Sequence, residues 1–407
     1  MATPSLPWWG APDSLSETNL PATTDFAVVG GGVMGLCTAY WLARGGARPL
    51  IIEQDRCGAG ATGRNGGFLA VGTTESYRAT IARFGRIAAR QILRLTVDNR
   101  AGAAELITEE EIACDLRSAG RLHLSLGLEE DDRLKRTMAV LVEDGCPTEW
   151  LDRAGVQGEI GTPLGPGITG ALFSPESALI HPGKLVRGLA GAARRRGASL
   201  TRARVERVEP DGAGVRVLTS RGIVLAGRVL LAVNAWTATL LPRYRDSIVP
   251  VRGQMLAYAP TGPVFRAGIT AMLTETEEYW QQAANGSIIL GGCRAVGPGR
   301  DEGVLATEPS PEVQHALEGV LPALFPQLGP LRVTHRWAGP MAFTRDRLPL
   351  VGPLPDLPAC WIAAGFSGHG MAMAFTLGRL VGSVLLTGRS DPRLNPFSLD
   401  RLTGATA

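Results

Sequence analysis

Lysine, cysteine and histidine are all scarce in this chain of 407 residues, and each shortage excludes some chemistry. Lysine occurs only at positions 135 and 184, so arginine carries nearly all of the positive charge. The six cysteines form no CxxC pair, which argues against a disulfide framework or a zinc site and favours reduced thiols in a cytoplasmic protein. Four of the five histidines are too dispersed to bind a metal and are expected to be structural: His123, His181, His315 and His335.

A strong charge imbalance and long apolar runs are also lacking. The formal net charge is +3, so neither a nucleic acid nor an anionic membrane is predicted as a partner. No apolar stretch reaches membrane-spanning length, and residues 1–24 lack the basic and apolar segments of a signal peptide. Hydrophobic residues nevertheless make up 45% of the chain, so we expect a large buried core in two or three domain-sized units.

The most informative motif that is present has the form Gly-x-Gly-x-x-Gly and follows an apolar segment at 25–29. Its spacing predicts a strand, a tight turn and a helix over 33–44, whose N-terminal N–H groups favour an anion. Gly30 permits the turn, Gly32 lets a pyrophosphate approach the backbone, and Gly35 lets the helix pack closely on the strand.

A second apolar segment ends in Glu53, about 20 residues beyond the glycines. A carboxylate at that position can accept hydrogen bonds from ribose hydroxyls, and it would repel the 2′-phosphate of NADP. The strand, the helix and the terminal carboxylate together predict a dinucleotide site. The alternative is a glycine-rich turn that only packs a helix on a sheet.

Three further segments favour a flavin over a nicotinamide cofactor, and the first two are glycine-rich loops. Residues 62–67 read Thr-Gly-Arg-Asn-Gly-Gly and offer backbone N–H groups, an arginine and an amide to a pyrophosphate or a flavin edge. Residues 365–371 again indicate a strand, a glycine loop and an apolar helix, whose N-terminus would face the flavin ring.

A strand and turn at 337–352 would bring Thr344 and Asp346 beside the same ring. The loop at 365–370 does not fit the GxSxG motif of serine hydrolases, because His369 takes the fifth position. For His369 itself, the alternative to a role at the flavin is a simple helix cap.

These motifs together resemble the D-amino-acid-oxidase-like flavoprotein family, which includes glycine and sarcosine oxidases. The resemblance covers almost the whole chain and is closest to the amine-oxidase branch that includes γ-glutamylputrescine oxidase. It rests on residues 30–35, Glu53, residues 63–67, His181-Pro182, Trp337-x-Gly339, residues 344–352 and residues 365–370. The residues expected to contact FAD are Gly30, Gly32, Val33, Met34, Gly35, Glu53, Gln54, Thr62, Arg64, Asn65, Gly66, Gly67, Val205 (with its backbone, at the adenine), Thr344, Gly368, His369, Gly370 and Met371.

Several departures from the family pattern are informative. Some relatives attach FAD through a cysteine, where this chain has residues 339–343 without one, or through a histidine near Arg64, where none is present, so we expect non-covalent FAD. The lysines that bind a substrate carboxylate and activate oxygen in sarcosine-type relatives are absent, and Met341 stands in the region of the carboxylate-binding arginine of glycine oxidases. Either the substrate lacks an α-carboxylate, or another arginine holds it.

The resemblance implies an amine or amino-acid oxidase. A neutral amine would give a hydride from its α-carbon to flavin N5, the imine would hydrolyse, and molecular oxygen would be reduced to hydrogen peroxide. We expect a glycine-like or N-substituted amino acid as the substrate, such as an N-carboxymethyl compound cleaved to glyoxylate and an amine. The alternatives are a polyamine-type oxidase that uses Glu275, Glu277 and Glu278, a flavin dehydrogenase with another electron acceptor, and a flavoprotein without catalysis.

Four residues are candidates for substrate contact: Arg252, Tyr279, Arg336 and His369. Either arginine could bind a carboxylate in a bidentate fashion, and for each the alternative is an ion pair elsewhere. Tyr279, together with the following tryptophan, could form an aromatic wall over the substrate or simply pack in the core.

Alternating helical and strand segments predict an α/β fold, with a Rossmann-like FAD-binding domain interleaved with a substrate domain built on a mainly antiparallel β-sheet with helices. The expected parts are an N-terminal arm at 1–24, an FAD-binding domain at 25–75, 171–240 and 340–390, a substrate domain at 76–170 and 241–339, and a tail at 391–407. Long helices are expected within 77–115, 129–154 and 182–196. The oligomeric state is left open.

Overall fold

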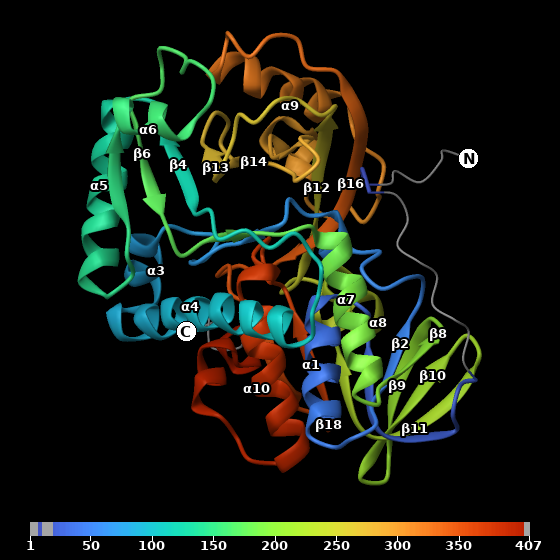
Figure 1. Cartoon of the computed structure of the whole chain (residues 1–407). Coiled ribbons are helices and arrows are strands. Elements are labelled where there is room, and N and C mark those ends of the chain that lie inside the picture. Colours follow the sequence, from blue (N-terminus) through green and yellow to red (C-terminus); the bar gives the residue numbers. More distant parts are fainter. Residues whose placement is uncertain (1–6, 10–18, 403–407) are drawn as a thin grey trace.

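The computed structural model describes residues 7–9 and 19–402, and two large β-sheets with their helices make up this part of the chain (Figure 1). The first sheet is parallel at its centre, and the second is mainly antiparallel. Strands from distant parts of the sequence join in each sheet. This architecture confirms the predicted α/β fold with an interleaved second sheet.

The first sheet is built around the βαβ unit that the glycine motif predicts. Its order is β17 (Leu350–Leu354), β18 (Leu357–Ala364), β11 (Gly222–Leu231), β1 (Thr23–Val29), β2 (Leu50–Glu53) and β8 (Ser199–Arg202), and β10 (Gly214–Thr219) pairs with both β11 and β9 (Val205–Asp211). Apolar side chains of α1 (Val33–Arg44), α4 (Arg86–Glu109), α7 (Pro182–Arg195) and α10 (Ala374–Thr387) form one buried cluster with a face of this sheet.

The second sheet lies above the first in the view of Figure 1. Its order is β16 (Val333–Phe343), β12 (Val249–Tyr258), β15 (Ile288–Gly291), β14 (Glu278–Gln282), β13 (Gly268–Ala271), β4 (Arg121–Ser125), β6 (Gly170–Ser174) and β5 (Glu149–Asp152). One face carries a buried apolar cluster that includes Leu122, Leu256, Ile269 and Trp280 and is completed by α9 (Pro311–Leu324).

The opposite face of the second sheet is more polar, and the strand registers fix which residues lie on it. Successive side chains of a strand point to opposite faces, and residues paired across strands share a face. Thr270 pairs with both His123 and Tyr279, Tyr279 pairs with Gly291, and Met255 pairs with Gly291. Two-residue steps along these strands add further members to this face: Arg121, Gly253, Trp337, Gly339, Met341 and Phe343.

The helix expected within 129–154 is in fact three elements. α5 (Leu128–Glu143) ends before Gly145, which has a φ of +79°, and β5 and α6 (Arg153–Glu159) follow. The positive φ and the nearby proline break the helix, and β5 then pairs with β6. The segment expected to be helical within 77–115 contains two helices, α3 (Tyr77–Phe84) and α4. α7 agrees with the helix predicted within 182–196.

Three segments lie elsewhere than the expected domain bounds place them. β6 belongs to the second sheet because it pairs with β4, although residues from 171 were assigned to the first domain. α4 packs against α10 in the first core, and β16 runs across the expected boundary at 340 within the second sheet. These contacts depend on register and packing that a one-dimensional pattern does not contain.

The remaining short elements are α2 (Ala61–Arg64), β3 (Phe68–Leu69), β7 (Ala178–Leu179) and α8 (Thr237–Leu240). Of the expected N-terminal arm, residues 1–6 and 10–18 lie outside the described ranges. Within it, Trp8 and Trp9 pack edge-on with a ring separation of 5.7 Å and lie against His181. Within residues 7–9 and 19–402, no helix is long and apolar enough to cross a membrane. All six cysteines are free and buried.

Candidate functional site

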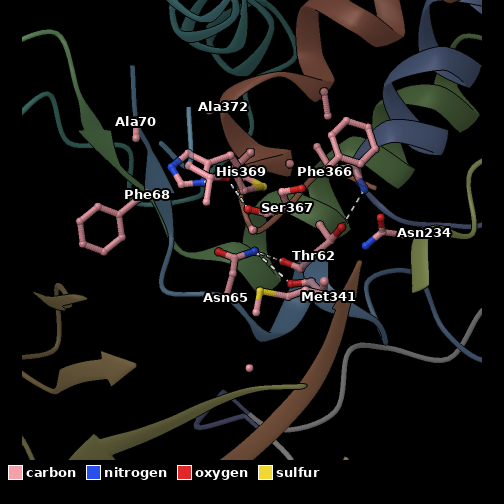
Figure 2. Close-up of a pocket in the computed structure, with 18 of the residues that line it drawn as sticks. Thr62, Asn65, Phe68, Ala70, Asn234, Met341, Phe366, Ser367, His369 and Ala372 are labelled. Atoms are coloured by element: carbon pink, nitrogen blue, oxygen red, sulfur yellow. Dashed lines mark hydrogen bonds between the residues drawn. The ribbon is translucent and has the colours of Figure 1, made fainter. Parts of the chain in front are cut away.

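A cavity of about 1150 Å³ lies where the polar face of the second sheet meets the carboxyl ends of the first sheet's strands. Its volume exceeds the roughly 300–1,000 Å³ typical of a site for one drug-sized ligand, so it has room for a dinucleotide and a substrate. Figure 2 shows part of its lining, with Thr62 and Asn65 from one side and Ser367 and His369 from the other.

The glycine turn at the start of α1 has the geometry of a phosphate cradle. Gly30 has a φ of +110°, and a Cβ atom there would lie 2.5 Å from the carbonyl oxygen of Ala232. Gly32, the N-cap residue, has no side chain to cap the first turn of α1. Among the described residues, only the N–H of Val33 in this turn has a side-chain acceptor, Oγ1 of Thr62 at 3.0 Å. The other N–H groups of this turn lack intrahelical acceptors and are available to an anion.

Glu53 is held at the end of β2 by the backbone. Its Oε2 accepts a hydrogen bond from the N–H of Gly31 at 2.7 Å, and its Oε1 accepts one from the N–H of Asp55 at 2.9 Å. Burial raises the pKa of Glu53, and these backbone hydrogen bonds oppose the increase. The carboxyl group is thus fixed beside the glycine turn, where ribose hydroxyls of a dinucleotide would lie.

The loop after α2 is fixed by the two side chains that the sequence singled out. The guanidinium of Arg64 donates to the carbonyl oxygens of Ala59 at 2.8 Å and Ala338 at 2.6 Å. The amide of Asn65 donates to Thr62 O at 2.6 Å and accepts from the N–H of Gly67 at 2.7 Å. Arg64 and Asn65 therefore shape the cavity wall as well as lining it.

The C-terminal glycine loop also lines the cavity, but its helix differs from the expectation. A single 3₁₀ turn, η5 (Gly370–Ala372), precedes α10, and Oδ1 of Asn99 accepts the N–H groups of Phe375 at 2.8 Å and Thr376 at 3.1 Å. Asn99 thus caps the helix from α4. The N–H groups free to face a flavin therefore belong to the glycine loop and not to α10. No local sequence signal indicates that Asn99 caps α10.

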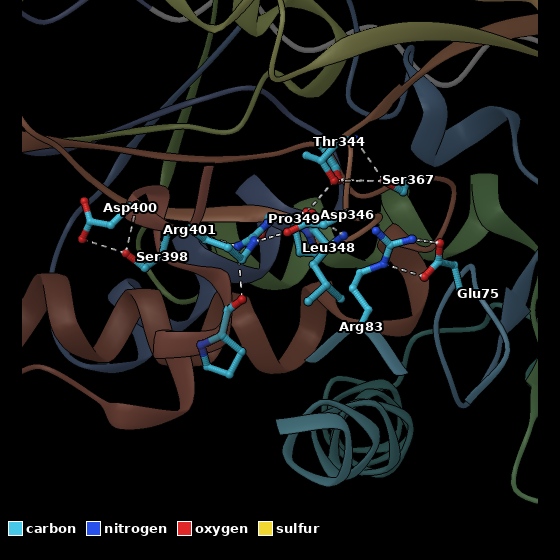
Figure 3. Close-up of polar contacts among 12 residues, drawn as sticks. Glu75, Arg83, Thr344, Asp346, Leu348, Pro349, Ser367, Ser398, Asp400 and Arg401 are labelled. Carbon is cyan, nitrogen blue, oxygen red and sulfur yellow. Dashed lines mark hydrogen bonds and ion pairs between the residues drawn. The ribbon is translucent and has the colours of Figure 1, made fainter. Parts of the chain in front are cut away.

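Thr344 and Asp346 support this loop from behind rather than lining the cavity. Oγ1 of Thr344 donates to the carbonyl oxygen of Leu348 at 2.8 Å, and its N–H donates to Oγ of Ser367 at 3.2 Å. The carboxylate of Asp346 forms an ion pair with Arg401 (Figure 3). Neither side chain reaches the position beside the ring that the sequence suggested.

His369 is held in one tautomer by its neighbour Thr74. The single hydroxyl hydrogen of Thr74 is donated to the carbonyl oxygen of Ser367 at 2.5 Å. The same hydroxyl lies 3.0 Å from Nδ1 of His369, so Nδ1 must carry the hydrogen and donate it. Burial lowers the pKa of His369, which keeps the ring neutral with a lone pair on Nε2. Because His369 lines the cavity, Nε2 can accept a hydrogen bond from a ligand there.

Most residues expected to contact FAD line the cavity, and the set fits that group in shape and chemistry. Three do not: Gly35 packs on Gly30, where a Cβ would lie 2.0 Å from the carbonyl oxygen, Gly67 turns behind Asn65, and Thr344 is buried. The residues that line it are Gly30, Gly32, Val33, Met34, Glu53, Gln54, Thr62, Arg64, Asn65, Gly66, Val205, Gly368, His369, Gly370 and Met371.

The two arginines proposed from sequence for a substrate carboxylate do not reach the cavity. Arg252 forms an ion pair with Asp301 at 2.6 Å, and Arg336 forms one with Glu318 at 2.9 Å. Arg252 directly precedes Gly253, and Arg336 directly precedes Trp337. Gly253 and Trp337 are the positions that lie on the cavity face. The alternation that puts Tyr279 on the cavity face therefore puts these arginines on the other side.

The cavity wall contains the pair His123 and Glu277. The sequence predicted a structural role for His123 and offered Glu277 as a possible carboxylate for a polyamine substrate. Nδ1 of His123 lies 3.2 Å from the Oε1 atom of Glu277, and its Nε2 lies 3.8 Å from Glu130. Burial alone would raise the pKa of Glu277, but the hydrogen bond and charge of His123, with the charge of Arg121, lower it to about 2. The same carboxylates raise the pKa of His123 against its burial. The alternating pattern of β4 contained this signal, because it puts Arg121 and His123 on one face.

Two further arginines line the cavity and were not singled out by the sequence. The guanidinium groups of Arg294 and Arg347 lie over the ring of Phe343, at 5.1 Å and 5.0 Å from its centroid. Within the described part of the chain, neither guanidinium has an ion-pair or hydrogen-bond partner. Burial and the charge of Arg347 lower the pKa of Arg294, which remains a cation. Arg294 opens the 3₁₀ turn η3 (Arg294–Val296) after β15, and Arg347 lies in the loop after β16, so no periodic pattern pointed to either residue.

Comparisons with known proteins agree with this geometry. The family model described as FAD dependent oxidoreductase (DAO) matches residues 25–383. The γ-glutamylputrescine oxidoreductase of Escherichia coli K12 is 27% identical over 386 residues, which covers 92% of this chain and 85% of that protein. The glycine oxidase of Bacillus licheniformis is 25% identical over 367 residues, covering 89% of this chain and 93% of that protein.

Among solved structures, that of glycine oxidase from Geobacillus kaustophilus superposes with a TM-score of 0.81 at 24% identity. The match covers 93% of this chain and 99% of the other. At this identity the likeness concerns the fold, which both chains share over nearly their whole length.

Proposed function

The chain belongs to the FAD-dependent oxidoreductase family, and from this premise we propose that it oxidises amino acids that carry a glycine-like or secondary amine. Its family membership and its relatives identify it, in broader terms, as an FAD-dependent oxidoreductase that acts on amine or amino-acid C–N bonds. When bound, FAD accepts a hydride from the carbon beside the substrate nitrogen and passes the electrons to oxygen. The expected products are hydrogen peroxide and an imine that hydrolyses to an aldehyde, such as glyoxylate, and an amine.

The observation that carries this proposal is the pair Arg294 and Arg347. Both guanidinium groups face the cavity beside Phe343, and neither has a carboxylate partner within the described residues. An unpaired, half-buried cation is costly, and a substrate carboxylate would relieve that cost with charge-assisted hydrogen bonds. They replace the carboxylate-binding groups whose absence the sequence reveals, and they support an amino acid over a simple amine.

The neighbouring residues suit the amine end of such a substrate. Tyr279 packs against Gly66, where a Cβ atom would lie 3.0 Å from the tyrosine ring, and so closes the space over the loop after α2. Neutral His369 presents Nε2 as an acceptor for an N–H of the amine, and so would orient the nitrogen beside the carbon that loses the hydride. Phe68, Met341 and Phe343 supply apolar surface that excludes water from the reacting carbon.

A second candidate, a polyamine-type oxidase, is favoured by the ionised carboxylate of Glu277. It lines the cavity with its pKa at about 2, so it is negative at neutral pH and could hold a distal ammonium group. His123 lies 3.2 Å from this carboxylate, and the carboxylates around His123 raise its pKa and so favour its cationic form, which leaves less of the negative charge for a cationic substrate. For this reason we prefer an amino acid to a polyamine as the substrate.

Matched substrates test the choice between these candidates. Sarcosine and N-carboxymethyl amino acids would be compared with amines of the same length without a carboxylate, and hydrogen peroxide would be measured with oxygen uptake. The proposal predicts turnover of the carboxylated compounds with one peroxide formed per oxygen consumed. Preferential turnover of polyamines would favour the second candidate, and flavin reduction without peroxide would favour a dehydrogenase.

The pH profile should report on His369. Because its neutral form accepts the amine N–H, kcat/KM should fall as the pH drops through its pKa, which burial places below the usual 6.5. His369→Asn should remove this acid limb, and Thr74→Val should move it to lower pH, because a protonated ring would lose its acceptor at Nδ1. His335→Asn, at an exposed histidine of β16, should leave the limb unchanged. An identical limb in His369→Asn would contradict this role.

A further inference from the structure

The cavity continues beyond Tyr279 along the second sheet, toward the strands β4, β6 and β5. We call this part the distal lobe and define it by six of the residues that line it: Arg121, Thr137, Cys146, Thr148, Ser174 and Glu176. It is separate from the cofactor cradle, and the proposed oxidation at Tyr279 and His369 does not use it. Its lining contains hydroxyl groups and charges of both signs.

The strand registers align three of these residues in one row. Arg121 of β4 lies directly opposite Ser174 of β6. Because Glu149 pairs with Phe173, Thr148 precedes β5 at the position across from Ser174. Residues opposite each other on adjacent strands share a face, so these three side chains stand side by side on the cavity face of the sheet.

Polar atoms of this row lack partners. Nε of Arg121 and Oγ1 of Thr148 are buried and form no hydrogen bond within residues 7–9 and 19–402. Nor does the guanidinium of Arg121 form an ion pair with a described residue. Leaving such groups buried without partners costs free energy that a ligand carrying an acceptor would recover.

The lobe also carries a carboxylate, that of Glu176, which has no hydrogen bond or ion pair within the described residues. Burial and, to a smaller extent, the charge of Glu176 raise the pKa of the Cys146 thiol to about 11, and the charge of Arg121 opposes the increase. Both charges therefore act at Cys146 without pairing with each other. The charge of Arg121 also lowers the pKa values of Glu277 and His369, so it acts on the reacting end of the cavity as well.

We propose that the distal lobe binds the zwitterionic amino-acid end of an extended substrate, with its carboxylate on Arg121 and Thr148 and its ammonium group facing Glu176. This inference rests on the proposed function, because it places the oxidised nitrogen beside Tyr279 and His369. Two strand spacings separate β14 from β4, a distance of about 10 Å, which sets the length of the chain between the two ends. The substrate class is thus an N-substituted glycine whose substituent ends in an amino acid.

Calorimetric titration of the FAD-loaded protein without oxygen tests this subsite with three probes of seven carbons. Heptanoate has one carboxylate, pimelate has two, and L-2-aminopimelate has two with an added ammonium group. We expect pimelate to bind about tenfold more tightly than heptanoate, as a charge-assisted hydrogen bond predicts, and L-2-aminopimelate to bind more tightly than pimelate. Equal affinities of heptanoate and pimelate would overturn the proposal.

Variants show which residues provide the gain in affinity of pimelate and L-2-aminopimelate. Arg121→Ala should remove the advantage of pimelate, and Glu176→Gln should remove only the further advantage of L-2-aminopimelate. Arg136→Ala, at an exposed arginine of α5 outside the cavity lining, is the matched control and should change neither. An unchanged preference for pimelate in Arg121→Ala would overturn the assignment. If that variant does not load FAD, Thr148→Val keeps the side-chain shape and should still reduce the advantage about threefold.

The proposed oxidation and the distal subsite are tested by separate measurements. Probe affinities do not depend on turnover, so Arg121-dependent binding of pimelate would support the distal subsite even if no amine reduced the flavin. Conversely, efficient oxidation of sarcosine, with no gain for N-carboxymethyl amino acids and no effect of Arg121→Ala on any probe, would support the proposed function and overturn the distal subsite.

Discussion

Gly30→Ala is expected to yield a protein that contains less than about a tenth of the normal FAD. Alanine at a φ of +110° is strained by roughly 1–2 kcal/mol, and its Cβ would lie 2.5 Å from the carbonyl oxygen of Ala232. That oxygen belongs to a backbone held in place by the hydrogen bond from Ala232 N–H to Val29 O at 2.8 Å. The turn must therefore move, and the N-terminus of α1 would lose its aim at the pyrophosphate. Flavin absorbance relative to protein absorbance measures the loss.

Gly46→Ala separates this effect from the strain of the backbone alone. Gly46 has a φ of +90°, but a Cβ there meets no atom within 4 Å. The control should lose about the same stability from strain and keep its FAD. Normal flavin content in Gly30→Ala, or equal loss in both variants, would contradict the cradle assigned to this turn.

The second large effect is expected from Arg294→Gln combined with Arg347→Gln. Each charge-assisted hydrogen bond to a carboxylate is worth about 1.5–3 kcal/mol, so losing both should raise KM for a carboxylated substrate about 100-fold or more. Glutamine removes the charge and retains polar reach, and at position 347, where φ is +65°, it replaces one non-glycine residue with another. Steady-state kinetics on FAD-loaded protein measure the change.

A neighbouring arginine supplies the control for this pair. Arg345 is exposed, lies two residues before Arg347 and does not line the cavity. Arg345→Gln should leave KM within about twofold of the parent. The pair would be excluded as the carboxylate site by an unchanged KM in the double variant, or by an equal rise for a substrate without a carboxylate.

The cofactor half of the site follows from local sequence. The turn at Gly30, the carboxylate at Glu53 and the loop at Arg64 and Asn65 are each read from a few adjacent residues, because backbone conformation and strand ends determine their roles. The predicted α/β fold with FAD as the cofactor is confirmed for the same reason. Non-covalent attachment stays a prediction.

The substrate half depends on contacts that no local pattern contains. Arg252 and Arg336 were predicted to contact the substrate because they are arginines on predicted strands. The alternation of side chains along each strand puts both on the face away from the cavity. Tyr279 could have served as the reference, since it fixes which members of the paired strands face the cavity. Arg294 opens a 3₁₀ turn and Arg347 lies in a loop, so periodicity predicts neither, and only the folded chain brings both guanidinium groups over the ring of Phe343.

The caps and supports of the site were hidden for a related reason. Asn99 lies in the middle of α4 and satisfies the first turn of α10, far along the chain. Thr74 fixes the tautomer of His369 from a loop that lies 295 residues earlier in the sequence. Hydrogen bonds across such separations follow from packing, so they become visible only once the helices are placed.

The most direct test of the central claim is the absorbance of the FAD-loaded protein mixed, without oxygen, with glycine, sarcosine, N-carboxymethyl amino acids, D-amino acids and polyamines. The account predicts that carboxylated secondary amines bleach the oxidised flavin band, and that the Arg294→Gln/Arg347→Gln variant needs far higher concentrations for the same bleaching. A flavin band that no amine bleaches would contradict the claim that this cavity oxidises a C–N bond.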